Sequence, residues 1–175
     1  MPVTPSVLTK PSSAKFIALT LLVALILNFL PWEEMLPLRP DFVALLLLYW
    51  SIHYPRKLGL GVAWLMGLLV DVADGSLLGQ HALAYSVMIF LALLLHRRIQ
   101  QFGPWQQALH VAVLLLLSQA LALLVRLVAG DDFTGWGYFL PTLTGMAAWP
   151  ALLLLVQSAQ QRKSKPEDAY PTGPK

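Results

Sequence analysis

Six apolar runs take up most of the chain, and they constrain its fold more than any other feature. We place them at Phe16–Leu30, Leu36–His53, Leu58–Val72, Leu77–Leu95, Trp105–Ala129 and Tyr138–Gln157. A straight transmembrane helix needs about 20 apolar residues, within a range of about 17–25. The last three runs meet this length, the first and third need flanking residues, and the second needs the region of Pro37 and Pro40. The sequence therefore predicts an all-α membrane protein, a six-transmembrane-helix bundle.

The composition explains why these runs indicate a membrane rather than a soluble core. Of the 175 residues, 57% are hydrophobic and 12% are charged, whereas soluble domains carry roughly 25% charged residues. A small soluble core leaves much of the chain exposed, so this much apolar surface needs a bilayer as its solvent. The isoelectric point near 9.3 does not indicate nucleic-acid binding, because the basic residues form short clusters beside apolar runs. The chain has no cysteine, which excludes disulfides, thiolate metal sites and cysteine nucleophiles.

Basic and acidic residues alternate between the runs, and this alternation predicts the topology. If all six runs cross, one side receives Lys10, Lys15, Arg56, Lys57, Arg97, Arg98, Arg162, Lys163 and Lys165. The other side receives Glu33, Glu34, Asp74, Asp131 and Asp132, with Asp41 and Asp71 near it. Only Arg39 and Arg126 break the pattern. The positive-inside rule then places both termini in the cytoplasm.

The two ends of the chain are expected to flank one membrane domain. Residues 1–15 and 159–175 are polar and rich in Pro, Ser and Lys, which predicts disordered cytoplasmic tails around a single transmembrane helical domain at 16–158. The first run also resembles a signal peptide, but it ends in Asn28-Phe29-Leu30-Pro31-Trp32 without a small-x-small cleavage site. We therefore expect it to be retained.

Small residues line one face of the third run. Gly59, Ala63 and Gly67 follow one another at intervals of four, and Asp71 is the next position in the series. Such a face lets a neighbouring helix backbone approach closely. Asp71 is therefore expected to face other helices, although a central acid costs roughly 2.5–3.5 kcal/mol on insertion scales and less near the interface.

The connection after Asp71 has the composition of a tight turn. Gly75 and Gly79 flank Ser76, which is placed to cap the fourth helix. The negative charge of Asp74 would interact favourably with the dipole at the N-terminus of that helix. One interpretation is a capped turn with small-residue packing and no further role. The other is a partner site or a buried polar network around Asp71.

A second pattern lies in the fifth run. Trp105, Ala112, Gln119 and Arg126 recur every seven residues, so two helical turns bring them onto one stripe. Gln119 lies deep and is expected to find a hydrogen-bond partner inside the bundle. Arg126 either extends outward toward Asp131 or Asp132, or pairs with Asp71, because the depths of the two residues match.

The remaining polar residues predict no catalytic or metal centre. The four histidines lack metal-ligand spacing. His81 and Ser86 lie five apart without an obvious orienting acid, which gives a serine-type intramembrane protease little support. We expect no cofactor and no metal. Pro150 is predicted to kink the sixth helix.

The run from Gly67 through Asp71, Gly75 and Gly79 to His81-Ala82-Leu83 resembles the signature of MreD, the bacterial rod-shape-determining membrane protein family. Pro40-Asp41 at the start of an apolar helix is similar too, as is the small size of the chain. The resemblance covers residues 16 to about 160.

The resemblance implies a non-enzymatic role in the bacterial inner membrane. MreD proteins belong to the elongation machinery that links cytoplasmic MreB filaments to peptidoglycan synthesis, together with the bitopic protein MreC. The family also looks similar in fold to the substrate-binding membrane components of vitamin transporters. The expected function is therefore a membrane adaptor that binds MreC and, directly or through it, MreB and the wall synthases. The alternative is a small-molecule-binding or uptake component with a cavity open to the outside.

Overall fold

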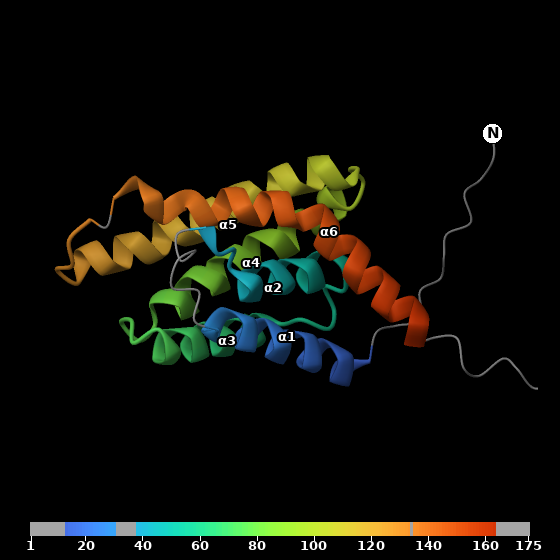
Figure 1. Cartoon of the computed structure of the whole chain (residues 1–175), viewed down its shortest axis with the longest axis horizontal. Helices are drawn as coiled ribbons and strands as arrows, with labels where there is room; N and C mark the ends of the chain where they lie inside the picture. Colours follow the sequence, from blue (N-terminus) through green and yellow to red (C-terminus); the bar gives the residue numbers. More distant parts are fainter. Residues whose placement is uncertain (1–12, 31–37, 134, 164–175) are drawn as a thin grey trace, which may run out of the picture.

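The computed structural model describes residues 13–30, 38–133 and 135–163. The described residues form helices and connections without a strand, as Figure 1 shows. The helices are α1 (Ala14–Phe29), α2 (Phe42–His53), α3 (Leu60–Ala73), α4 (Gln80–Ile99), α5 (Pro104–Val128) and α6 (Leu140–Lys163), with a 3-10 turn, η2 (Trp136–Phe139), before α6. Each predicted run overlaps one of these helices, with bounds that differ by several residues. The predicted tails lie largely outside the described residues.

Three helices are long and apolar enough to cross a bilayer: Gln80–Ile99, Pro104–Val128 and the continuous segment Trp136–Gln160. The first three helices are shorter, at 16, 12 and 14 residues. At 1.5 Å per residue, α2 is only about 18 Å long, less than the roughly 30 Å hydrocarbon core. Helix α2 begins only at Phe42, after the start of the predicted run at Leu36. The reason is Pro40, which lacks an N–H and disfavours helical backbone in the residue before it. That all six helices cross remains a prediction.

Helix α2 forms the centre of the bundle. Ten of its twelve residues are buried, and it packs against α1, α4 and α6. The Trp50 indole donates to the Thr20 hydroxyl at 3.0 Å, and its ring meets Phe16 edge-on at 5.9 Å. These contacts hold α1 against α2. Helix α4 in turn packs against α2, α3 and α5, so α2 and α4 together connect all the other helices.

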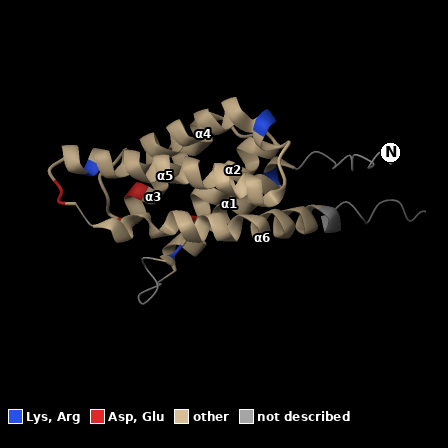
Figure 2. Ribbon diagram, turned by 90° about the horizontal axis from the view of Figure 1, so that it is seen from above, with Lys and Arg blue, Asp and Glu red and all other residues tan. Residues whose placement is uncertain are grey.

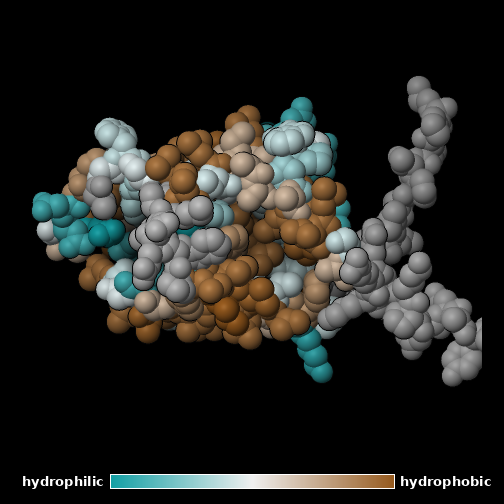
Figure 3. All heavy atoms as spheres, viewed as in Figure 1, coloured by the Kyte–Doolittle hydropathy of each residue, from teal (hydrophilic) through white to brown (hydrophobic). Residues whose placement is uncertain are grey.

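The surface suits a membrane. Large apolar side chains are exposed along the helices, including Leu154 at 69% and Val113 at 61%. Figure 3 shows hydrophobic surface over the middle of the molecule and hydrophilic residues toward its ends. In Figure 2 the acidic residues gather toward one end, whereas most basic residues lie at the other. Acidic and basic residues that alternate between connections along the chain therefore lie mostly at opposite ends of the folded bundle.

Candidate functional site at the acidic end of the bundle

Helices α3 and α4 approach each other closely at Gly67. A Cβ atom there would lie 2.4 Å from both the backbone N and the Cα of Ala82. Ala63, one turn earlier, is fully buried. Gly59 is instead the N-cap of α3, with open space around it. The small-residue face predicted from the sequence therefore packs at Ala63 and Gly67 but not at Gly59.

Two glycines shape the connection between α3 and α4. Gly75 has φ of +62° and Gly79 has φ of +98°, a region of backbone conformation that other residues adopt only at a cost. Between them, the Ser76 N–H donates to the Asp71 carbonyl at 3.0 Å. The chain thus reverses within a few residues and brings the start of α4 beside the last turn of α3.

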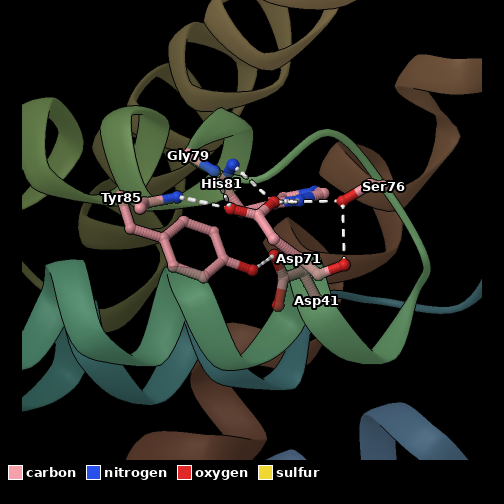
Figure 4. A network of polar contacts seen from close by, with 7 residues as sticks. Asp41, Asp71, Ser76, Gly79, His81 and Tyr85 are labelled. Atoms are coloured by element: carbon pink, nitrogen blue, oxygen red, sulfur yellow. Dashed lines mark hydrogen bonds and ion pairs between the residues drawn. The ribbon is translucent and has the colours of Figure 1, made fainter.

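Asp71 is fully buried beneath this connection. Its Oδ1 accepts from the Ser76 hydroxyl at 3.0 Å, the His81 N–H at 2.9 Å and His81 Nδ1 at 2.8 Å. Its Oδ2 accepts from the Gly79 N–H at 2.9 Å and the Ala82 N–H at 3.4 Å. Figure 4 shows the carboxylate facing the start of α4. Asp71 therefore supplies the N-cap that Gly79, which has no side chain, cannot provide for its own helix.

The structure does not bring Asp71 and Arg126 together. Arg126 Nε lies 3.3 Å from Asp131 Oδ2, and both side chains are substantially exposed. This matches the alternative in which Arg126 extends outward. The polar contacts of Asp71 within the described chain come from the Ser76–Ala82 segment, whose donors fill both carboxylate oxygens. Ser76 was expected to cap α4 directly, but its hydroxyl donates to Asp71.

A second carboxylate, Asp41, organises the neighbouring helix ends. It is the N-cap of α2 and accepts from the Ala44 N–H at 3.0 Å. Asn28, near the end of α1, donates to Asp41 Oδ1 at 3.2 Å and accepts from the Phe42 N–H at 3.1 Å. The Tyr85 hydroxyl donates to Asp41 Oδ2 at 2.5 Å. Asp41 therefore joins α1, α2 and α4.

No sequence pattern placed Asn28, Asp41 or Tyr85 in a functional site. A sequence signal existed for Asp41, because an aspartate after proline and before an apolar helix is a typical N-cap. Asn28 and Tyr85 gave no comparable signal, since their partners are distant in sequence. The two carboxylate clusters meet on α4, where the rings of His81 and Tyr85 lie 5.8 Å apart, one turn from each other.

A cavity of about 440 Å³ lies beside these clusters. Its wall is formed by residues of α1, α3, α4, α5, η2 and α6 and of the connections beside α2 and α3. These residues are Asn28, Arg39, Asp41, Val70, Asp74, His81, Tyr85, Ser118, Gln119, Ala122, Gly137, Tyr138 and Pro141. The Gln119 side-chain carbonyl accepts from the Thr142 hydroxyl at 2.6 Å, which ties α5 to α6. Burial raises the pKa of the Asp74 carboxyl, although nearby His81 and Arg39 oppose the shift. With Asp41 and Asp74 on one hand and Arg39 on the other, the cavity wall carries acidic and basic side chains.

Nothing in this geometry arranges a nucleophile. Asp71 and His81 orient each other, but the Ser86 hydroxyl donates at 2.7 Å to the Ala82 carbonyl of its own helix. Among the described residues, no group of three or more histidine and acidic side chains is placed to hold a metal ion. The contacts of Asp41 and Asp71 fix the first turns of α2 and α4.

Two apolar grooves lie away from the polar clusters. One, of about 360 Å³, runs between α1 and α3 and is lined by Ala14, Ile17, Ala18, Leu21, Leu22, Leu25, Lys57, Leu58, Val62, Met66 and Leu69. The other, also about 360 Å³, lies between α5 and the η2–α6 segment. Both have a mostly apolar lining, as expected for surfaces that face lipid or another transmembrane helix.

Comparison with known proteins gives the family. A family model described as rod shape-determining protein MreD matches residues 12–159. The chain belongs to the MreD family. A rod shape-determining protein MreD of Haemophilus influenzae is 28% identical over 141 residues, which are 80% of this chain and 87% of that protein. No solved structure matches, so the expected likeness to vitamin-transporter components has no support.

Family membership makes this chain a rod-shape-determining membrane protein. The matched range contains both carboxylate clusters, the cavity and the groove between α1 and α3. The resemblance inferred from the glycine–aspartate segment is thereby confirmed at the level of the family.

Proposed function

We propose that this MreD-family protein is a non-enzymatic, multi-pass adaptor of the elongation machinery in the bacterial inner membrane. In this role it binds the transmembrane region of MreC and helps to couple MreB filaments to peptidoglycan synthesis. The observation that carries the proposal is the apolar groove between α1 and α3, together with membership of a rod-shape-determining family.

The groove has the shape and chemistry of a helix-docking surface. From α1 it takes side chains at intervals of three and four, Ala14, Ile17, Ala18, Leu21, Leu22 and Leu25, which form one helical face. From α3 it takes Val62, Met66 and Leu69. Ala14 and Ala18 allow the backbone of a partner helix to come close. Close packing matters in a bilayer because the hydrophobic effect does not drive helices together there. The α1 face is about 17 Å long, about half of the hydrocarbon core.

The charge separation supports the orientation. The α2–α3 connection, which carries Arg56 and Lys57, and the last turn of α4 lie at the end opposite the connection after α5, which carries Asp131 and Asp132 (Figure 1). With the basic end in the cytoplasm, both termini lie on the side of the MreB filaments. The Asp41 and Asp71 clusters then lie toward the outer surface.

Blocking the groove tests the docking step. Ala18→Trp places an indole in it, and Ala120→Trp is the matched control, because Ala120 is also exposed on a helix but lines neither groove nor the cavity. Tagged protein should lose at least tenfold in co-purified MreC with Ala18→Trp and keep it with Ala120→Trp. Equal recovery by both variants would refute docking in this groove.

Depletion tests the cellular role and separates it from the uptake alternative. Rod-shaped cells depleted of the protein should become round, while their purified wall synthases still polymerise. Wild-type protein and Ala120→Trp should restore the rod shape, whereas Ala18→Trp should not. Normal shape combined with loss of uptake of one nutrient would replace the adaptor role with the transport role.

A further inference from the structure

The cavity at the acidic end has more polar groups than the packing of the bundle uses. Ser118 is 6% exposed and lines the cavity, and within the described residues its hydroxyl has no hydrogen-bond partner. The Gln119 carbonyl is occupied by Thr142, which leaves its NH₂ available to the same space.

The charges on the wall are also incompletely paired. Asp74 lines the cavity, and its exposed carboxylate makes no hydrogen bond or ion pair to any described residue. Arg39 lines it too, and its guanidinium donates to the Asn28 carbonyl at 2.5 Å. Its remaining N–H groups are available for an anion. An acid and a guanidinium thus face one cavity without contacting each other.

We propose that this cavity binds a zwitterionic small molecule of the amino-acid or short-peptide class. Its ammonium group lies against Asp74 and its carboxylate against Arg39, while Ser118 and the Gln119 NH₂ hydrogen-bond to its polar centre. A ligand with both charges bridges the two groups that the protein leaves apart. A purely cationic or anionic ligand would satisfy only one of them.

Size and surroundings agree with this class. A volume of about 440 Å³ falls within the roughly 300–1,000 Å³ of small-molecule sites and far exceeds the space of one or two waters. Val70, Ala122 and Pro141 supply an apolar wall for a short side chain. The site is separate from the groove between α1 and α3, with which it shares no lining residue, so it goes beyond the adaptor role.

The test is thermal unfolding of the full chain in detergent, titrated with L-alanyl-L-alanine, its N-acetyl form, its C-terminal amide, and L-alanine. The dipeptide should raise the unfolding temperature in a saturable manner. Each blocked form should need at least a tenfold higher concentration for half of that effect. L-Alanine carries both charges, so its response relative to the dipeptide shows whether the site takes one residue or two.

Variants locate the effect. Asp74→Asn and Ser118→Ala should each raise the half-saturating dipeptide concentration, by at least tenfold and about fivefold respectively. Asp132→Asn removes an exposed acid from another connection and should leave it unchanged. The Asp74 carboxylate makes no hydrogen bond within the described chain, so its variant should fold. Calorimetric titration at fixed temperature gives a second readout. The proposal is overturned by no response to either zwitterion, by equal responses to the blocked forms, or by equal responses of all variants.

Discussion

Replacing Asp71 with asparagine should destabilise the protein more than any other single charge removal at this end of the bundle. The substitution keeps the size of the side chain but puts an NH₂ in place of one carboxylate oxygen. If the amide oxygen keeps the Ser76 and His81 contacts, the NH₂ faces the N–H groups of Gly79 and Ala82. Two donors then point at each other, and the N-terminus of α4 loses part of its cap.

The magnitude follows from these contacts. A hydrogen bond to a charged group contributes about 1.5–3 kcal/mol, and a buried donor left without a partner costs roughly 1–3 kcal/mol. Chains unfolded within a membrane or micelle find other partners, which reduces such differences. We therefore expect Asp71→Asn to lower the free energy of unfolding by about 2–4 kcal/mol, a large share of the roughly 5–15 kcal/mol that stabilises most proteins.

Chemical unfolding in a fixed detergent, followed by circular dichroism, measures this loss. Asp132→Asn is the control, because Asp132 is exposed and surface changes are usually within about 0.5 kcal/mol. Asp71→Asn and Arg126→Gln should act additively to within about 0.5 kcal/mol, since the two residues share no partner. A loss below 0.5 kcal/mol for Asp71→Asn would refute the capping argument, and strong coupling to Arg126 would restore the pairing expected from the sequence.

Three further predictions concern helix packing, the Asp41 cluster and topology. Gly67→Ala should cost about 1–3 kcal/mol or more, because its Cβ would overlap the Ala82 backbone. Gly61→Ala, in open space on the same helix, should be neutral or stabilising by about 0.5–1 kcal/mol. Equal changes in the free energy of unfolding for Gly67→Ala and Gly61→Ala would contradict the close approach. Tyr85→Phe removes the hydroxyl that donates to Asp41 and should cost about 1.5–3 kcal/mol, whereas an unchanged unfolding midpoint would show that this bond adds nothing. Reporter fusions should give cytoplasmic signals after residues 57, 98 and 165 and exterior signals after 34, 75 and 132, and a reversed signal at any one would remove a helix from the predicted topology.

The local features of the fold could be predicted because their causes are local. Apolar runs interrupted by proline, glycine and charge set the order of the helices and placed each approximately. Alternating basic and acidic connections predicted the two ends of the bundle, which the structure separates. The glycine–aspartate segment from Gly67 to His81 indicated the family through its resemblance to the MreD signature, and the family match confirms that resemblance.

The partners of the buried polar groups depended on tertiary structure. Depth along two helices made Asp71 and Arg126 a plausible pair, but depth does not give the direction of a side chain or its nearest donors. The turn folds the N-terminus of α4 over Asp71, so backbone N–H groups occupy its oxygens, while Arg126 reaches Asp131 nearby in sequence. Asn28, Asp41 and Tyr85 come from three helices and meet only when α1, α2 and α4 pack.

The sequence by itself therefore determined which segments must be buried away from water and which segments form helices. Hydropathy, proline and glycine suffice for this because each acts over a few residues. Only the tertiary structure decided that Asp71 caps a different helix from its own. It also decided that α2 lies at the centre and that residues from six helical elements line one cavity. These features depend on which donors and apolar faces become neighbours after packing, and helical periodicity alone does not specify those neighbours.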